Sequence, residues 1–228
     1  MDRARAFALG AVVAAGVGLL TGCEGRRSEE RRPALAEAAA PGPGDGSWEL
    51  VYEQEVEGNV DLYLVSAAGG RARRLTTHPR EDLHARWMPD GRHLIFTSNR
   101  TGNPQLWELS VSDGGLRRVR ANDAAESQPD PSPDGRRVAV LSDHGGPQRR
   151  LVLDLNSGGG DEVVRHGKRS IFGNPHWSPD GSHIAFSSNW RIGHHIYTVE
   201  VATGEVTRIV GGCEPRFTRD GRRVAYVS

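Results

Sequence analysis

Apolar and polar residues alternate in short runs through most of the chain after residue 46. Three examples of six residues each, "HLIFTS", "RVAVLS" and "HIAFSS", are rich in β-branched and aromatic side chains, and turn residues bound each of them. Partial alternation over so short a run predicts a β-strand, because side chains on a strand repeat every two residues. No stretch after Gly46 keeps a helical period, so the sequence predicts an all-β fold.

The runs belong to an internal repeat. Asp-Gly pairs begin at Asp45, Asp90, Asp134, Asp180 and Asp220, with separations of 45, 44, 46 and 40 residues. The sequences "RWMPDGRHLIFTSN", "DPSPDGRRVAVLSD", "HWSPDGSHIAFSSN" and "RFTRDGRRVAYVS" align around the last four pairs without a gap. Full units continue into further strands such as "HIYTVEV" and "EVTRIV", whereas the first unit is degenerate around "GDGSWELVYEQ". This period predicts propeller blades of about four short antiparallel strands, with four full units and the beginning of a fifth.

The units resemble the TolB-type propeller repeat, whose pattern is close to "PxWSPDGxxIAFxSxxxGxxxIYxxDxxxGxxxRLT". The resemblance runs from Leu50 to Ser228. It implies a blade with "NPHW" innermost, then "HIAFSS", "HHIYTVEV" and, at the outside, "EVTRIV". Propellers of this type usually have six blades, so a chain of four to five blades is either a short ring closed by pairing its two ends or a truncated piece of a longer one. We expect closure to be imperfect, since an unclosed propeller leaves open strand edges.

The recurring "SPDG" segment has the residue order of a type I turn. Proline presets the backbone at the second position, and glycine accepts the positive φ angle that follows. A catalytic residue is needed once, so an aspartate that recurs in every unit is interpreted as structural. The residues assigned to these structural turns are Asp90, Gly91, Asp134, Gly135, Asp180, Gly181, Asp220 and Gly221.

Two polar positions precede each turn and differ from unit to unit. One lies directly before the aromatic position at the end of the innermost strand, and the other lies three residues before it. Inner strands surround the channel of a propeller, so these side chains are predicted to line its mouth and to bind a partner. The candidate channel-face residues are His84, Arg86, Gln128, Asp130, Asn174, His176, Glu214 and Arg216.

The first 46 residues differ from the repeats. Residues 1–22 have the basic start and short apolar core of a secretory signal, and residues 23–46 are a polar, Pro- and Gly-rich tether before the propeller of residues 47–228. The segment "LTGC" resembles the lipobox of bacterial lipoproteins, which implies a lipid on Cys23. We therefore expect a protein of the bacterial cell envelope, anchored on the periplasmic side or at the cell surface. Glu24 favours the outer membrane over the inner one.

The charge balance and the absence of several motifs argue against some classes of function. The 29 basic residues balance the 29 acidic ones, and the arginines are scattered, which argues against nucleic-acid binding. The sequence lacks a GxSxG elbow and a phosphate-binding loop, so no cofactor is expected and an enzyme is disfavoured. His194 and His195 are adjacent, so on a strand they would point to opposite faces and could not chelate one metal together.

The leading hypothesis is a noncatalytic, lipid-anchored envelope propeller that binds a protein or peptide partner through its channel face. The alternative is a glycan-binding or metal-dependent polysaccharide lyase-like propeller. That alternative would use His84, Asp130 and His176 around a cation, with a glycan as the partner.

Overall fold

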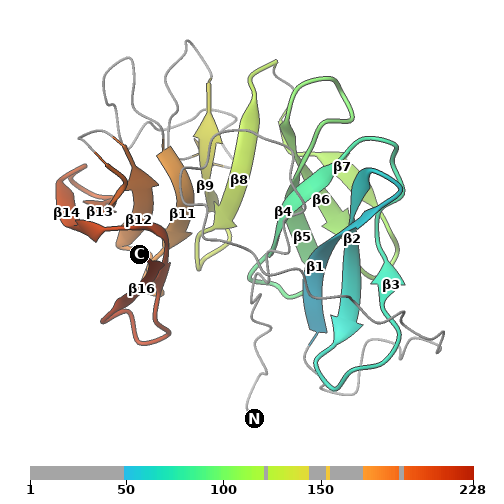
Figure 1. Ribbon diagram of the computed structural model, residues 1–228, viewed down its shortest axis with the longest axis horizontal. Helices are drawn as coiled ribbons and strands as arrows, with labels where there is room; N and C mark the ends of the chain where they lie inside the picture. Colours follow the sequence, from blue (N-terminus) through green and yellow to red (C-terminus); the bar gives the residue numbers. More distant parts are fainter. Residues whose placement is uncertain (1–48, 121–122, 144–152, 155–171, 190–192) are drawn as a thin grey trace.

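The computed structural model describes residues 49–120, 123–143, 153–154, 172–189 and 193–228. Within these ranges every regular element is a β-strand, and the strands form five antiparallel sheets (Figure 1). This confirms the predicted all-β class. The proposed signal, Cys23 and the tether lie outside the described residues. Among the residues described, no helix has the length and apolar character that a membrane crossing would need.

The fourth sheet is a complete blade with strand order β11-β12-β13-β14. Its strands are β11 (Phe172–Trp177), β12 (His183–Ser188), β13 (His195–Glu200) and β14 (Val206–Gly211). This is the order implied by the repeat, from the innermost strand to the outermost. The five residues of β12 after His183 are all buried, because neighbouring strands and the adjacent blade cover it.

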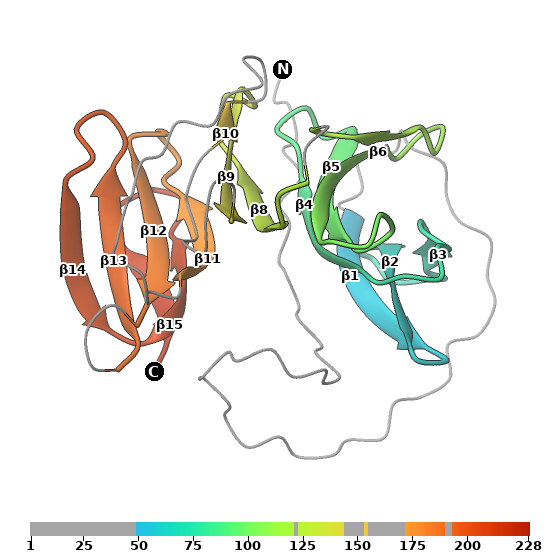
Figure 2. The ribbon, with the colours of Figure 1, turned by 90° about the horizontal axis from the view of Figure 1, so that it is seen from above.

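The other sheets follow the same plan; the second also has four described strands, and the remaining three have fewer. The first holds β1 (Glu49–Val56), β2 (Asn59–Ser66) and β3 (Arg73–Arg74). The second holds β4 (Asp82–Trp87), β5 (His93–Ser98), β6 (Gln105–Ser110) and β7 (Leu116–Arg118). The third holds β8 (Glu126–Pro131), β9 (Arg137–Ser142) and β10 (Leu153–Asp154), and the last holds β15 (Cys213–Phe217) and β16 (Val224–Val227). Figure 2 shows the sheets side by side in chain order.

The turn between β11 and β12 shows how the "SPDG" sequence acts. The Gly181 N–H donates to the Ser178 carbonyl at 2.9 Å, and Gly181 has a φ of +72°. Asp180 accepts hydrogen bonds from the Ser178 hydroxyl (2.6 Å) and the Ser182 N–H (3.0 Å), which lower the pKa of Asp180 to about 2. The same glycine bond and positive φ recur at Gly91, Gly135 and Gly221. Every residue of the turn thus has a structural task.

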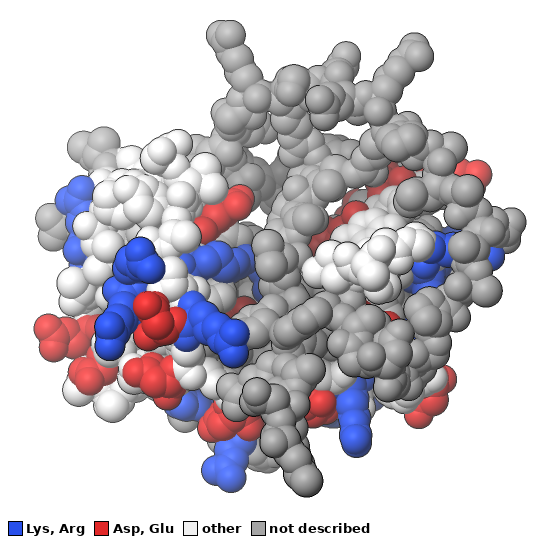
Figure 3. Space-filling view, turned by 90° about the horizontal axis from the view of Figure 1, so that it is seen from below, with Lys and Arg blue, Asp and Glu red and all other residues white. Residues whose placement is uncertain are grey.

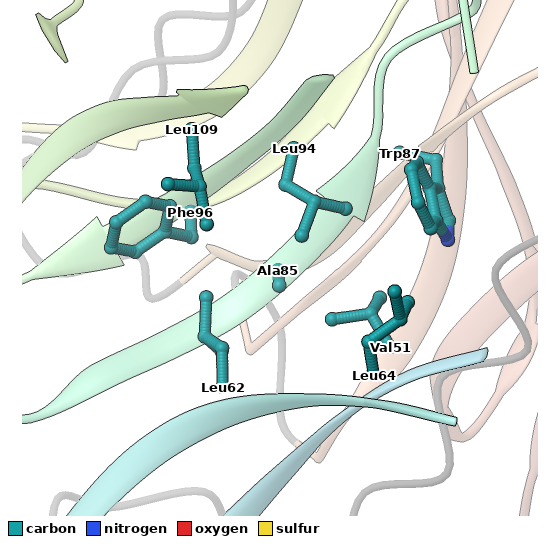
Figure 4. Close-up of a cluster of buried hydrophobic side chains, with 8 residues drawn as sticks. All are labelled: Val51, Leu62, Leu64, Ala85, Trp87, Leu94, Phe96 and Leu109. Atoms are coloured by element: carbon teal, nitrogen blue, oxygen red, sulfur yellow. The ribbon is translucent and has the colours of Figure 1, made fainter. Parts of the chain in front are cut away.

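The core lies between neighbouring blades. Trp87, at the end of β4, belongs to a buried cluster with Val51 and Leu64 of the first sheet and Leu94 of its own sheet (Figure 4). Trp177 occupies the same place two interfaces later, in a cluster with Ala139 and Leu141 of the third sheet. The large aromatic before the turn therefore packs one blade against the preceding one.

A buried ion pair anchors the inner strand of the second blade. Arg100 donates two hydrogen bonds to the fully buried Asp82 carboxylate, at 2.9 and 3.0 Å, and a third to the Ser98 hydroxyl at 2.9 Å. Its guanidinium also lies 4.7 Å from the centre of the Trp107 ring. Because both charges have several partners, the burial of Asp82 does not leave an uncompensated charge.

The described sheets do not form a ring that is closed by pairing its ends. Strand β1 pairs with β2, and β16 pairs with β15, but no strand pairing among the described residues joins the first sheet to the last. The sequence alternative of closure by pairing of the two ends is therefore not realised in these residues. The first sheet also begins at the second strand of a blade, since β1 aligns with β5 and β12.

Candidate functional site

Four residues, each three positions before the aromatic position that ends the innermost strand of its blade, share an unusual backbone conformation. His84, Gln128, Asn174 and Glu214 have φ angles of 57°, 55°, 51° and 54°. Each lies at a bulge, where three steps along the inner strand oppose two steps along its neighbour. An extra residue in a strand takes such a conformation and bends the strand. These four positions, called the first column below, thus share one backbone conformation although their side chains differ.

The N–H groups at three of these bulges donate to side chains of the preceding blade. The His84 N–H donates to Glu53 Oε1 at 2.6 Å, and the Gln128 N–H donates to Thr97 Oγ1 at 3.2 Å. The acceptors stand at equivalent positions of β1 and β5. The third blade has Leu141 at this position, which cannot accept, and the Asn174 N–H instead donates to Gln128 Oε1 at 2.8 Å. The bulge N–H therefore has a side-chain acceptor in all three blades, although the accepting residue differs.

The second column, which consists of the residue directly before the aromatic position in each blade, also links neighbouring blades. Asp130 Oδ2 accepts a hydrogen bond from the Trp177 N–H at 2.8 Å, and His176 Nδ1 accepts one from the Phe217 N–H at 3.2 Å. The counterpart of Asp130 and His176 in the second blade is Arg86, whose side chain cannot accept a hydrogen bond. The counterpart of the donating residue in the next blade is Pro131, which has no N–H. Donor and acceptor are thus both absent from this contact, so no backbone N–H is left without a partner there.

The four side chains of the second column come from four sheets and influence one another electrostatically. Arg86 Nε lies 3.5 Å from Asp130 Oδ1, and both side chains are largely buried. Burial, and then the positive charge of Arg86, lower the pKa of Arg216 to about 10, while Asp130 acts in the opposite direction. Burial also lowers the pKa of His176, with Asp130 opposing and both arginines contributing. Residues of four blades, Arg86, Asp130, His176 and Arg216, thus form one electrostatic cluster, called the central cluster below.

The first column adds a buried histidine and a buried carboxyl beside this cluster. Burial, followed by repulsion from Arg86, lowers the pKa of His84 from 6.5 to about 4. The His84 Nδ1 atom is buried and has no hydrogen-bond partner. Burial raises the pKa of Glu53, although the hydrogen bond from the His84 N–H and the charge of Arg86 oppose that shift. Both imidazoles near the axis are therefore neutral at pH 7.

The side chains that the alternative hypothesis would use do not assemble as metal ligands. Among the described residues there is no group of three or more His, Cys, Asp or Glu side chains placed to hold a metal ion. His176 Nδ1 already accepts the Phe217 N–H, and Asp130 is shared between Arg86 and the Trp177 N–H. The geometry thus gives the metal-dependent lyase no support.

Residue Glu53 was missed by the sequence reasoning. Its carboxyl is close enough to Arg86 to be influenced by its charge, and its counterparts in the repeat include the polar Thr97 and Ser187 and the apolar Leu141. Aligning the second strand of each blade and comparing the residue that follows its aromatic position would have identified Glu53 as a candidate. Elsewhere, a polar cleft of about 440 Å³ lies near Asn59, Glu81 and Asn99 and contains none of the predicted site residues.

The charged surface agrees with the balanced composition. On the face shown in Figure 3, basic and acidic side chains lie next to one another over the sheets from β11 to β16. The described part of this face has no continuous basic area. Such an area is what phosphate backbones need for binding.

The repeated four-stranded sheets, bulged inner strands and inter-blade aromatic residues define a β-propeller. The profile of the TolB beta propeller domain family matches residues 33–168, and the chain belongs to this family. The Tol-Pal system protein TolB of Francisella tularensis, in strain FSC147, is 34% identical over 79 residues. That match covers 33% of this chain and 18% of the relative, so the matched segment spans less than a fifth of the relative's length.

Solved structures agree on the fold. TolB from Acinetobacter baumannii superposes with a TM-score of 0.64 at 20% identity, over 74% of this chain and 43% of that one. A putative TolB from Agrobacterium tumefaciens gives 0.65 at 20% identity, over 81% and 75%. A puromycin-hydrolyzing peptidase of Mycobacterium tuberculosis gives 0.61 at 16% identity, over 82% and 33%. Because the scaffold occurs in an enzyme too, these similarities establish architecture alone.

Proposed function

We propose that this protein is a noncatalytic propeller of the bacterial cell envelope that binds a protein or peptide partner through its channel face. The observation that carries the proposal is the central cluster. It occupies equivalent positions in four blades, yet its residues are Arg86, Asp130, His176 and Arg216. Repeated scaffold residues stay constant while these differ, which is how a symmetric fold acquires an individual binding surface.

The chemistry of the cluster suits recognition of polar peptide groups. Arg86 and Arg216 supply guanidinium donors that are held near a single shared carboxylate, Asp130. Within the described residues, the guanidinium groups of Arg86 and Arg216 donate hydrogen bonds to the carbonyls of their preceding residues, Ala85 at 3.1 Å and Pro215 at 3.4 Å. Guanidinium groups in such a setting bind carbonyl and carboxylate oxygens of a partner well.

The family supports a protein partner. The curated relatives are named as proteins of the Tol-Pal system, and an envelope role is carried over to this chain by analogy. The fold also occurs in enzymes, but the described residues of the central cluster show no nucleophile placed beside a base. Binding to a partner is therefore favoured over catalysis.

Comparative capture from envelope extracts tests this function. Wild-type protein is compared with Arg86→Ala, Arg216→Ala and a control, Ile209→Ser, which changes an exposed residue of β14. We expect wild type and the control to retain the same partner, and both arginine variants to lose it while keeping a cooperative melt. Capture that is equal for all four proteins, or absent for wild type, would contradict the channel-face proposal.

The anchor is proposed separately, on Cys23. The support for it is in the sequence alone, in the basic start, the short apolar core and the "LTGC" segment that ends at Cys23. Mass spectrometry of protein from the native membrane tests it. We expect a lipid-modified N-terminal peptide that starts at residue 23, and an unmodified or disulfide-linked Cys23 would contradict the anchor.

A further inference from the structure

The hairpin between β1 and β2 is shorter than the corresponding loops of the second and fourth blades. Val56 pairs directly with Asn59, so Glu57 and Gly58 alone form the turn, with φ angles of 54° and 79°. Two positive φ angles are typical of the tight type I′ hairpin. In the second blade residues 99–104 connect β5 to β6, and in the fourth blade residues 189–194 connect β12 to β13. The short hairpin thus leaves space beside the loop 99–104.

The polar cleft of about 440 Å³ occupies this space. Its described lining comes from the β1–β2 turn, from the link that leads into β4, and from the loop 99–104. The volume lies within the range of about 300–1,000 Å³ that is usual for small-molecule sites. This inter-blade cleft lies between the first two blades and shares no described residue with the central cluster.

Hydrogen bonds fix both walls of the inter-blade cleft. On one side, Asn59 Nδ2 donates to the His78 carbonyl at 2.9 Å. On the other side, the Asn99 N–H donates to the Glu81 carbonyl at 3.3 Å, and the adjacent Arg100 forms the buried ion pair described above. A ligand therefore meets a cleft that is already formed, which reduces the entropy lost on binding.

Several polar groups of the lining have no strong partner within the described part of the chain. Asn59 Nδ2 donates both of its hydrogens to protein oxygens, whereas Asn59 Oδ1 accepts no hydrogen bond there. The Glu81 carboxylate accepts a long hydrogen bond of 3.4 Å from Asn99 Nδ2, and Asn99 Oδ1 accepts none. The Arg80 guanidinium also makes no hydrogen bond or ion pair with a described residue. The cleft thus offers free acceptors together with the donors of Arg80.

This lining argues against several kinds of ligand. Arg80 and Glu81 are the charged residues of the described lining, and their charges cancel, so the cleft has no net charge to balance an ionic ligand. The described residues also contain no group of three acidic, histidine or cysteine side chains that could hold a metal ion.

A peptide is disfavoured as well. The largest apolar groups in the described lining are Pro79 and Pro104, so the cleft lacks the deep apolar pocket in which an aromatic anchor of a peptide is buried. Apart from Asn59, the described lining residues lie outside strands, so the cleft offers no strand edge to an extended chain.

We propose that the inter-blade cleft binds a neutral oligosaccharide. A hydroxyl group both donates and accepts hydrogen bonds, so a sugar ring can donate to Asn59 Oδ1 and the Glu81 carboxylate while it accepts from Arg80. The rings of the two prolines provide CH surface for the apolar face of the sugar. This site is separate from the channel, so it does not rest on the proposed function and does not use the channel histidines.

Calorimetric titration of the full chain with the neutral trisaccharides chitotriose and maltotriose tests this proposal. We expect saturable binding of at least one of them, with an affinity that changes by less than about twofold between low and high salt, because the ligand carries no charge. Binding of neither trisaccharide would overturn the proposal.

Substitutions locate the binding site. Glu81→Ala and Asn99→Ala each remove a polar group of the cleft and should weaken binding by about tenfold. The matched control is Asn189→Ala, since Asn189 follows β12 in "FSSN" as Asn99 follows β5 in "FTSN". This control should bind as wild type does, and so should Arg86→Ala in the central cluster.

A measurement on wild type keeps the test decisive if a variant folds poorly. In two-dimensional NMR spectra, the side-chain amide signals of Asn59 and Asn99 should shift during the sugar titration, whereas that of Asn189 should not. Equal losses for Asn99→Ala and Asn189→Ala, or shifts confined to residues outside the cleft, would overturn the proposal. Failure of partner capture at the central cluster would leave these results unchanged, so the two proposals fail separately.

Discussion

His176 and Phe217 join two neighbouring blades through one hydrogen bond, in which the His176 Nδ1 atom accepts the Phe217 N–H at 3.2 Å. One blade earlier, Asp130 accepts the Trp177 N–H at 2.8 Å. Side chains that the sequence marks as candidate binding residues therefore also hold the blades in register. Substitutions at these positions affect both functions, and the predictions below separate them.

The hydrogen bond of Asp130 can be tested apart from its charge. Asp130→Asn retains an oxygen acceptor for the Trp177 N–H but loses the charge that faces Arg86. Asp130→Ala leaves the buried N–H without a partner, which costs about 1–3 kcal/mol. Urea unfolding should place Asp130→Ala below Asp130→Asn in free energy of unfolding by that amount. Equal stabilities would show that this hydrogen bond does not hold the blades together.

The bulge at Asn174 predicts an unusual order of substitutions. Asn174 has a φ of 51°, a conformation open to glycine and asparagine but unfavourable for β-branched residues. Asn174→Gly should therefore change the free energy of unfolding by less than about 1 kcal/mol, and Asn174→Val should lower it by about 1–3 kcal/mol. Thermal denaturation of the two variants checks this. A valine variant as stable as the glycine variant would refute the bulge geometry.

The buried histidines predict a loss of stability in mild acid. The pKa of His84 is lowered to about 4 by burial and by Arg86, so between pH 6.5 and about 4 the unfolded chain binds more protons than the folded one. Stability is thus complete above pH 6.5 and falls as the pH drops towards 4, by roughly 1–3 kcal/mol for this residue. The raised pKa of Glu53 acts in the opposite direction.

The variant His84→Asn isolates this effect, since asparagine accepts the positive φ and does not titrate. Urea unfolding at pH 7.5 and pH 5 should show a larger loss for wild type than for His84→Asn. Parallel losses in the two proteins would mean that His84 is not protonated on unfolding in this range.

The ion pair of Arg100 and Asp82 should contribute far more than a surface pair. Arg100→Ala leaves the Asp82 carboxylate buried without its partner, which costs about 3–5 kcal/mol. Arg100→Lys keeps the positive charge but loses the Nε donor to Ser98 and the planar guanidinium over the Trp107 ring. The control is Arg117→Ala, which breaks an exposed pair with Glu108 and should cost less than about 1 kcal/mol. Denaturant midpoints give the comparison, and similar losses would contradict the assigned role.

The fold was accessible from the sequence because its determinants are local and repeated. The "SPDG" turn, the alternating strands and the aromatic before the turn recur at a fixed spacing, so each copy supports the assignment of the others. The strand order within the complete fourth blade is the one that the resemblance to the TolB-type repeat implies. The bulge was not foreseen, because His84, Gln128, Asn174 and Glu214 share no side-chain chemistry.

The site was accessible only in part, since its contacts join residues about 40 positions apart. Arg86 stands where two other blades have a hydrogen-bond acceptor, and Pro131 stands where they have the backbone donor. Neither residue alone indicates that the other has changed as well. The role of Glu53 depends on an N–H that a bulge turns towards it. Such relationships appear only when neighbouring blades are placed together.

Site-specific cross-linking in the native envelope tests the central claim most directly. A photoreactive residue is placed at Glu214, an exposed channel-face position two residues before Arg216, and in a matched protein at Ile209, on the outermost strand β14. The account predicts a discrete cross-linked partner from position 214, absent from position 209 and lost when Arg86→Ala is added. Absence of a product at position 214, or the same product from both positions, would contradict binding through the channel face.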